Sequence, residues 1–344
     1  MIRVEGIGME IVKKSVNIIN YDKREIEDRD IGENFNAYIE ELINYFKLNE
    51  STRKYKSRSL NTEVVSSILE IVSNQDEFGN LNKNISRRLL KEEIKVQEKI
   101  SNMGVDIQKG SLIQAVVLDD TDNYMYVIAK VEHEKFVDDI DYSFKSGFSR
   151  DKQKIWKTCI FESINEDVGS IESKIFLNNK AKYWTDSFLE LDEVRNDEIN
   201  TISAFKSVDA LLRREVKKYS EGDYFILKNS LVGELRKETL VDYPEMVKNL
   251  VTGYKTDNNN IDINKLKDSL LELPKTHNFD NQFNSIPESL KKASERIFKV
   301  SDNIELKIKG HIDPNKISMQ RESDGRLYVK IETDNERLIN IFNN

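Results

Sequence analysis

GSLIQAVVLDDTDNYMYVIAKV, residues Gly110 to Val131, contains two apolar runs separated by a polar turn. The runs Gly110 to Leu118 and Tyr124 to Val131 have the length and the β-branched and aromatic content of strands. The residues between them, Asp119 to Asn123, are of the types that form turns. The stretch therefore predicts an antiparallel β-hairpin and favours an antiparallel sheet in the N-terminal part of the chain.

Further strands and several helices are predicted around this hairpin. The remaining strand predictions are Ile155 to Ile164, Lys174 to Leu177 and Lys182 to Leu189. Apolar residues recurring at three and four positions predict five helices: Asn36 to Phe46, Thr62 to Ser73, Ile85 to Asn102, Asn196 to Tyr219 and Asp223 to Glu238. An antiparallel sheet flanked by helices, an α+β fold, is the simplest arrangement of these elements.

The last third of the chain differs in composition from the rest, because all four prolines lie there. Short helices are predicted at Glu245 to Tyr254, Ile263 to Leu271 and Pro287 to Val300, with polar breaks between them. We place a domain boundary near Leu240. The prediction is an α+β N-terminal domain, residues 1–240, and a smaller C-terminal domain, residues 241–344, of short helices followed by a β-hairpin module and a terminal helix.

The hairpin module is predicted from period-two alternation near the C-terminus. Asn303 to Gly310 and Ile317 to Gln320 read as strands, and Ser323-Asp324-Gly325 supplies a tight turn before Arg326 to Ile331. The amphipathic run Glu336 to Phe342 predicts a short terminal helix.

The residue order in this module, IELKIKGHIDPNKISMQRESDGRLYVKIETDNERLINIF, resembles the C-terminal end of the bacterial nucleoid-associated protein family, the YejK/NdpA family. A second stretch, AKYWTDSFLELDEVRNDEINTISAFKSVDALLRREV, is also similar to that family. The resemblance implies association with the nucleoid and DNA as a partner, and it supplies no catalytic residues.

Composition limits how such a protein would bind DNA. The chain has 344 residues, 38% of them hydrophobic, and a formal net charge of −8. Affinity for a duplex grows with the number of phosphates that are neutralised, so an acidic chain must bind through local basic surfaces. The sequence has no apolar run of membrane-spanning length and does not begin like a signal peptide. We therefore expect a cytoplasmic, nucleoid location and no membrane partner.

Three basic clusters are the candidate nucleic-acid-binding residues. They are Arg53, Lys54, Tyr55, Lys56 and Arg58, expected in a loop; Arg87, Arg88 and Lys91; and Arg213, Arg214, Lys217 and Lys218 near the end of a helix. The alternative interpretation is a solvated surface, and in the third cluster cations that complement the helix dipole.

An enzymatic interpretation rests on carboxylates near a lysine. Asp119, Asp120 and Asp122 precede a strand that holds Lys130 and Glu132, and nucleases collect such groups around metal ions. Asp is also a good turn former, and Lys130 with Glu132 resembles an exposed pair on one strand face. We favour the turn interpretation and predict neither catalytic residues nor a metal.

Other isolated residues favour structural roles. Cys159 is predicted to be a small core residue. Glu132, His133 and Glu134 cannot converge on one metal ion, because consecutive strand residues point to opposite faces, and His133 is predicted to be a surface residue. Trp184 and Phe188 are expected in the core rather than stacked on bases. The glycines form no phosphate-binding loop, so no cofactor is predicted.

Three functions remain open. The first is a non-enzymatic, nucleoid-associated protein that binds DNA directly or through another protein. The second is a nuclease or other effector in defence against phage, and the third is a protein–protein interaction module without nucleic-acid binding. A homodimer is the candidate oligomer.

Overall fold

The computed structural model of the chain describes residues 9–21, 23–48, 51–100, 110–131, 133–137, 139–148, 155–162, 164, 171–177, 182–237, 239–290, 295–309 and 312–342. The chain forms two compact units, residues 1–196 with 280–282 and residues 197–279 with 283–344. The predicted α+β fold is confirmed. The two units divide after residue 196, whereas the predicted domain boundary lies near Leu240. The domain boundary near Leu240 stays a prediction.

The first unit is built on an eight-stranded sheet whose neighbouring strands are all antiparallel, in the order β10-β3-β9-β8-β5-β4-β1-β2. The strands are β1 (Glu10–Asn20), β2 (Glu25–Arg29), β3 (Arg53–Ser57), β4 (Ser111–Leu118), β5 (Tyr124–Val131), β8 (Ile155–Phe161), β9 (Glu172–Leu177) and β10 (Leu191–Glu193). The predicted hairpin is β4–β5, with Ser111 opposite Val131. A separate hairpin pairs β6 (His133–Val137) with β7 (Phe144–Phe148).

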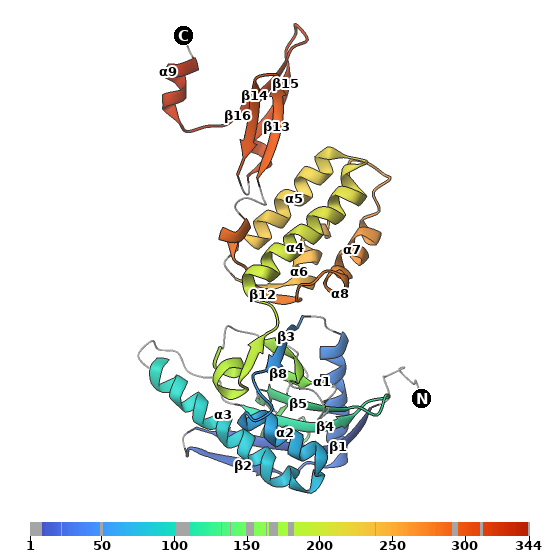
Figure 1. Cartoon of the computed structure of the whole chain (residues 1–344), viewed down its shortest axis with the longest axis vertical. Helices are drawn as coiled ribbons and strands as arrows, with labels where there is room; N and C mark the ends of the chain where they lie inside the picture. Colours follow the sequence, from blue (N-terminus) through green and yellow to red (C-terminus); the bar gives the residue numbers. More distant parts are fainter. Residues whose placement is uncertain are drawn as a thin grey trace. The chain divides into compact units, whose positions relative to one another are not determined.

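Different helices cover the two faces of this sheet. Side chains alternate along β5, so that Tyr126 and Ile128 face one side and Met125 and Val127 the other. Helices α2 (Glu63–Ser73) and α3 (Phe78–Ile100) pack on the first face, and α1 (Asn36–Leu48) packs on the second (Figure 1). Helix α3 begins seven residues before the predicted start at Ile85 because Phe78 is buried.

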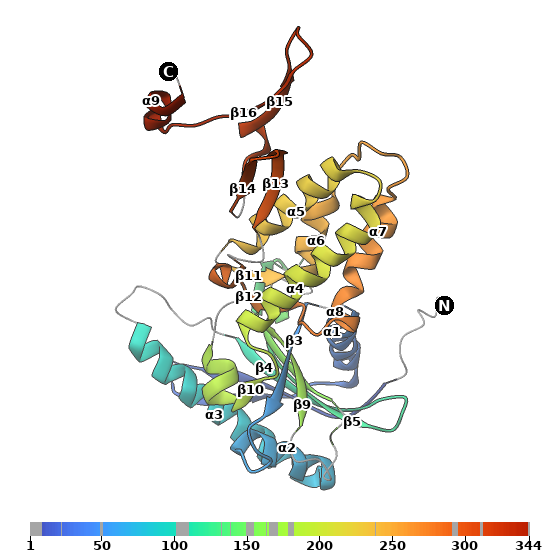
Figure 2. The same cartoon turned by 45° about the horizontal axis from the view of Figure 1, so that its top comes forward.

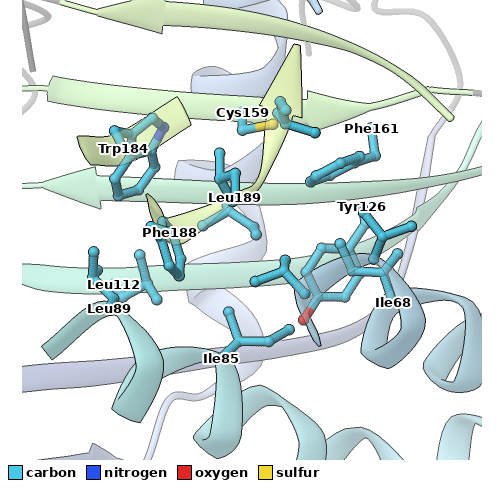
Figure 3. Packing of buried hydrophobic residues seen from close by; sticks show 14 of the residues in the cluster. Ile68, Ile85, Leu89, Leu112, Tyr126, Cys159, Phe161, Trp184, Phe188 and Leu189 are labelled. Carbon is cyan, nitrogen blue, oxygen red and sulfur yellow. The ribbon is translucent and has the colours of Figure 1, made fainter. Parts of the chain in front are cut away.

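Figure 3 shows the core on the α3 face of the sheet, where Leu89, Cys159, Phe161, Trp184 and Phe188 are all fully buried. Burying one large apolar side chain contributes about 1.5–3 kcal/mol relative to leaving it exposed. Burial also raises the pKa of the Cys159 thiol. The core predictions for Cys159, Trp184 and Phe188 are therefore confirmed.

The second unit contains a helical core. Its helices are α4 (Asp197–Leu212), which continues as a π-helical turn (Arg213–Lys217), α5 (Glu221–Leu235), α6 (Tyr243–Val251), α7 (Ile263–Leu271) and α8 (Leu273–Thr276). Figures 1 and 2 show α4 and α5 side by side. A short pair, β11 (Leu240–Asp242) and β12 (Gln282–Asn284), adjoins them.

Two separate hairpins and a short helix follow. The hairpins pair β13 (Arg296–Ser301) with β14 (Ile304–Ile308), and β15 (Ile317–Arg321) with β16 (Leu327–Ile331). The turn glycine of the second hairpin, Gly325, has φ of +85°, as the tight turn requires. The predicted hairpin module is confirmed, and the terminal helix is a 3-10 turn, Glu336–Leu338, followed by α9 (Ile339–Phe342).

Three element predictions are wrong. Residues 182–189 form a helical turn, Trp184–Phe188, because Trp184 and Phe188, four residues apart, both enter the core. The predicted helix from Pro287 to Val300 is a 3-10 turn, Pro287–Leu290, followed after a gap in the described residues by strand β13. The predicted basic loop at Arg53 is strand β3.

Candidate nucleic-acid interface

Helix α3 carries the candidate interface on its outer side. Its inward side chains recur at spacings of three and four residues, as expected for an amphipathic helix. They are Phe78, Asn82, Ile85, Ser86, Leu89, Leu90 and Glu93. This stripe packs on the sheet, so the opposite side of α3 faces solvent (Figure 1).

A buried polar network fixes the middle of α3 to the sheet. Ser86 Oγ donates to Asn17 Oδ1 at 2.8 Å, and Gln114 Nε2 donates to the Asn82 carbonyl at 2.9 Å. The hydroxyl of Tyr126 donates to Gln114 Oε1 at 3.0 Å. Each satisfied bond contributes about 1 kcal/mol, and an unsatisfied buried partner would cost more. The network therefore sets the register of α3 on the sheet.

A buried ion pair fixes the next turn of the helix. Glu93 Oε1 accepts from Lys130 Nζ at 2.5 Å and from the Tyr183 hydroxyl at 2.6 Å, while its second oxygen accepts from the Tyr21 hydroxyl. Burial lowers the pKa of Lys130, and Glu93 opposes this shift. Burial, reinforced by the Glu93 charge, raises the pKa of Tyr21 and Tyr183. The carboxylate is thus held by one cation and two hydroxyls.

Lys157 of β8 extends this cluster. Its Nζ lies 5.0 Å from the centre of the Tyr183 ring, and burial, with a smaller effect of Lys130, lowers the pKa of Lys157 to about 8. Perturbed lysines are a feature of many active sites. Here, however, Lys130 and Glu93 are both 0% exposed, so they cannot meet a substrate. We assign the cluster to holding α3 in place.

Five basic residues follow one another at four-residue intervals along the outer side of α3. They are Lys83, Arg87, Lys91, Lys95 and Lys99, and we call them the α3 basic ridge. Each step advances about 6 Å along the helix axis, so the ridge is about 24 Å long. Lys91 lies half a turn around the helix from the buried Asn82, so the ridge crosses the solvent-facing side.

Two members of the ridge are already paired with carboxylates. Lys83 Nζ lies 2.5 Å from Asp28 Oδ2, and Lys95 Nζ lies 2.7 Å from Glu92 Oε1. Both lysines remain substantially accessible, with side-chain exposures of 39% and 52%. Exposed pairs of this kind are weak, so either lysine can turn toward another anion at small cost.

The other three members are exposed. Arg87, Lys91 and Lys99 make no ion pair within 4 Å to any residue that the structure describes, although Arg87 bonds to the Asn84 amide. Of the carboxylates on α3, only Glu98 is exposed, and it lies 3.7 Å from Arg24. The outer side of the helix is therefore predominantly cationic.

This arrangement has a cost in the free protein. Like charges four residues apart destabilise a helix by about 0.2–0.5 kcal/mol per pair. Favourable interaction with the helix dipole compensates only in the last turn, where Lys99 lies. A polyanion bound along the ridge would remove the repulsion, which makes this surface suitable for a nucleic-acid backbone.

The first predicted cluster is divided by strand β3. Arg53 and Tyr55 point inward and are buried, and Arg53 pairs with Glu193 at 2.8 Å. The expectation that this segment is a loop is wrong because its burial alternates residue by residue, as in a strand with one covered face. Neither Arg53 nor Tyr55 offers its polar group on an open surface.

The other members of that cluster lie among carboxylates. Lys54 and Lys56 are exposed on the opposite face of β3, where Lys56 is paired in register with Glu172 and Asp192. The Arg58 guanidinium bonds to Asp186 at 2.5 Å and to Asp192 at 2.9 Å, which raises its pKa further. The cluster does not form a concentrated positive surface.

In the second cluster, Arg88 has a structural role, whereas Arg87 and Lys91 are exposed. Arg88 donates to the carbonyls of Ser187 and Phe188 and pairs with Glu63 and Glu190. Arg88 therefore joins α3 to the helical turn Trp184–Phe188. Arg87 and Lys91 remain on the surface as members of the α3 basic ridge.

The third cluster is interleaved with carboxylates. Arg213 pairs with Asp209 at 3.0 Å, and Lys217 lies 3.6 Å from Glu221. Arg214 and Lys218 both approach Glu215, at 2.7 and 3.8 Å. Burial and the Asp209 hydrogen bond act in opposite directions on Arg213, and its pKa is raised overall.

The residues of the enzymatic interpretation are not brought together. Asp119 Oδ1 accepts from the backbone N–H groups of Thr121 and Asn123, which makes it a turn former. Lys130 lies at the other end of β5 and is buried, so its prediction as an exposed residue is wrong. Glu132 lies outside the described residues.

His133 is half-buried, and the prediction that it lies on the surface is wrong. Its Nε2 is 2.7 Å from Ser111 Oγ, and its ring packs edge-on against Phe148. Burial, and then the charge of Arg29, lower the pKa of His133. Within the described part of the chain, no group of three or more His, Cys, Asp or Glu is arranged to hold a metal ion.

Sequence reasoning missed Lys83, Lys95 and Lys99 of the ridge. The signal was present as a basic residue at every fourth position from 83 to 99. The predicted helix start at Ile85 leaves Lys83 outside the helix, and charges four residues apart are not adjacent in the sequence.

No helix within the described ranges is both long and apolar enough to cross a bilayer. Comparison with known proteins found no matching family model, no matching curated protein and no matching solved structure.

Proposed function

We propose that this chain is a non-enzymatic DNA-binding protein of the bacterial nucleoid, and that the α3 basic ridge contacts the phosphates of a duplex. The observation that carries the proposal is the row of five basic residues at four-residue intervals, which winds across the solvent-facing side of α3 with Lys91 at its centre. The resemblance of residues 304–342 and 181–216 to the nucleoid-associated family supports the same function.

The length of the ridge sets the size of the contact. About 24 Å corresponds to about seven base pairs, since phosphates on one strand are separated by about 3.4 Å along the duplex axis. Five phosphate contacts would give a logarithmic salt slope of about −4.5. Lys and Arg side chains that reach only phosphates carry no sequence information, so binding is expected to be independent of sequence.

The test replaces Arg87, Lys91 and Lys99, the three ridge cations with no acidic partner among the residues that the structure describes. Fluorescence anisotropy with a labelled duplex of about 20 base pairs measures the affinity of wild type and of R87Q/K91Q/K99Q across salt concentrations. We expect the variant to bind unrelated duplexes more weakly and its salt slope to be lower by about 2.7, because three phosphate contacts are lost.

A matched control separates local contact from overall charge. The variant K237Q/K248Q/K275Q loses the same number of positive charges from exposed positions elsewhere, each beside a carboxylate three residues away. It should retain the wild-type salt slope. Equal losses in both variants, or no binding by wild type at low salt, would contradict binding through the ridge.

A second candidate function is protein–protein interaction through the C-terminal hairpins. In β13–β14, Phe298 is opposite Leu306, and in β15–β16, Met319 is opposite Val329, so each hairpin has one apolar face. Exposed large apolar residues in this segment are Ile297, Phe298, Val300, Ile304, Met319, Leu327, Tyr328, Ile331, Ile339, Ile341 and Phe342. Concentrated exposure of this kind is typical of an interaction surface.

The charge of the segment favours a second copy of this chain as the partner. Residues 296–342 carry nine Lys or Arg and eight Asp or Glu, although the whole chain has a net charge of −8. Two nearly neutral segments do not repel each other, and identical apolar faces can pack around a two-fold axis. Isolated two-stranded hairpins are only marginally stable, so each would gain from the added contact.

A further inference from the structure

A small cationic cavity lies in the second unit. It has a volume of about 260 Å³ and is formed by the turn Arg213–Lys217, helix α5 and strand β13. Four cations line it: Arg213, Lys217, Lys228 and Arg296. They come from three elements that are separate in the sequence, so the cavity exists only in the folded chain.

Tyr224 is the centre of this cluster. Its ring centre lies 5.7 Å from the Arg213 guanidinium, 5.6 Å from Lys217 Nζ and 5.6 Å from Lys228 Nζ. Arg296 lies 4.8 Å above the ring of Phe225 and donates to the Asn229 amide oxygen at 3.1 Å. The aromatic rings therefore hold the charged groups in fixed positions around the cavity.

Two of the cations are deep in the fold. Lys228 is 3% exposed and Arg296 is 8% exposed. Burial lowers the pKa of Lys228 and of Arg296. Lys228 is compensated by Asp209 at 3.0 Å, and Arg296 by its bond to Asn229, so both charges are accommodated within the fold. The four cations against two carboxylates on the lining leave the cavity with a positive balance, which favours an anion.

Carboxylates near the cavity pair with basic residues, among them three of the four cavity cations. Asp209 accepts from the Tyr224 hydroxyl at 2.7 Å and from Lys228 and Arg213 at 3.0 Å. The lining carboxylates are Glu221, 3.6 Å from Lys217, and Glu295, which pairs with Lys307 at 2.7 Å. Cations on the lining still outnumber carboxylates.

We propose that this cavity binds a terminal phosphate group, carried by a small phosphorylated molecule or by the end of a DNA strand. Two guanidinium groups and two ammonium groups match the several oxygens and the double negative charge of a phosphate monoester. The volume is below that of cavities for drug-sized ligands, which suits one phosphate rather than a whole nucleotide. The proposal is independent of the α3 basic ridge, which belongs to the other unit.

The test measures binding of inorganic phosphate by isothermal titration calorimetry in a chloride buffer of low ionic strength. Wild type is compared with R213Q/K217Q, whose two changed side chains are 56% and 43% exposed and whose fold should survive. Loss of two charge-assisted hydrogen bonds should weaken phosphate binding by at least about tenfold. The single variant K217Q replaces the double variant if circular dichroism shows unfolding.

The matched control is R214Q/K218Q, which removes the same charge from the neighbouring positions in the turn and directly after it, outside the cavity lining. It should bind phosphate within about twofold of wild type. An absence of phosphate binding by wild type, or equal weakening in both double variants, would overturn the proposal.

Competition then distinguishes the two sources of the phosphate. If a 5′-phosphorylated oligonucleotide displaces inorganic phosphate and its 5′-hydroxyl counterpart does not, the ligand is a DNA end. If neither oligonucleotide displaces it, the ligand is a small phosphorylated molecule. R87Q/K91Q/K99Q should bind inorganic phosphate normally, so failure of ridge binding leaves this result unchanged.

Discussion

The Nζ atom of Lys130 lies 2.5 Å from Oε1 of Glu93, and both side chains are completely buried. The pair joins the centre of the sheet to the helix that carries the α3 basic ridge. A buried pair of this kind contributes little net stability compared with apolar residues, but removing one partner leaves the other charge uncompensated. Its expected role is to fix one position of α3 rather than to strengthen the fold.

Glu93→Gln should lower the free energy of unfolding by about 3–5 kcal/mol, because the Lys130 charge would lose its carboxylate. The double variant E93L/K130M removes both charges and should recover part of that loss, because the Tyr21 and Tyr183 hydroxyls would still lose their acceptor. Urea denaturation of the three proteins measures the difference. A double variant as unstable as E93Q would show that the unpaired Lys130 charge is not what destabilises E93Q. Glu92→Gln, beside it on α3, should change stability by less than about 1 kcal/mol.

Lys157 should make stability depend on pH. Its pKa falls from 10.5 to about 8 in the folded chain. Below about pH 8 the group is charged in both states, and the cost of burying the charge is fully present. Between pH 8 and 10.5, the pKa of Lys157 in the unfolded chain, the unfolded chain binds more protons than the folded chain, so the free energy of unfolding rises with pH.

Replacing Lys157 by Met removes this dependence while retaining an unbranched side chain. The variant should be more stable than wild type at about pH 7, and the difference between their free energies of unfolding should decrease as the pH rises to about 9.5. Urea denaturation at intervals across this range measures the gap. A constant gap would mean that Lys157 keeps its ordinary pKa in the folded chain.

Two glycines should respond to alanine substitution in opposite directions. Gly325 has a positive φ, so Gly325→Ala would strain the β15–β16 turn by about 1–2 kcal/mol. Gly79 lies in the first turn of α3 with nothing within 4 Å of an added Cβ, so Gly79→Ala should stabilise that helix by about 0.5–1 kcal/mol. Limited proteolysis of the hairpin and thermal melting of the whole chain are the respective measurements. If both substitutions stabilised the protein, or both destabilised it, the predicted effects of the two backbone conformations would be contradicted.

Local pattern was sufficient to predict the parts of the fold that depend on near neighbours. The β4–β5 hairpin and the Gly325 turn are examples, because a hairpin is specified by its own strands and turn. The segment around Trp184 was predicted incorrectly, since its aromatic content fits a strand while its four-residue spacing fits a helix. Only packing against the sheet decides between these structures.

The candidate site was harder to predict because burial depends on distant partners. Lys130 was expected on the surface, and its partner Glu93 is 37 residues away in the sequence. Arg53 was expected in an exposed loop, but Glu193 lies beside it in the fold. Charges at helical spacing are visible in the sequence, whereas the neutralisation of charges by distant carboxylates is not.

Self-association through the C-terminal hairpins predicts a concentration-dependent dimer. Sedimentation velocity of wild type should show a monomer–dimer equilibrium, and Ile304→Glu or Leu327→Glu should weaken it by at least about tenfold, since each places a charge in an apolar contact. Val194→Glu, a change of the same kind at a 40% exposed position in the other unit, should leave the equilibrium unchanged. A wild-type protein that remains monomeric at about 100 µM, a concentration ample for a specific interface, would exclude a second copy as the occupant of the apolar faces.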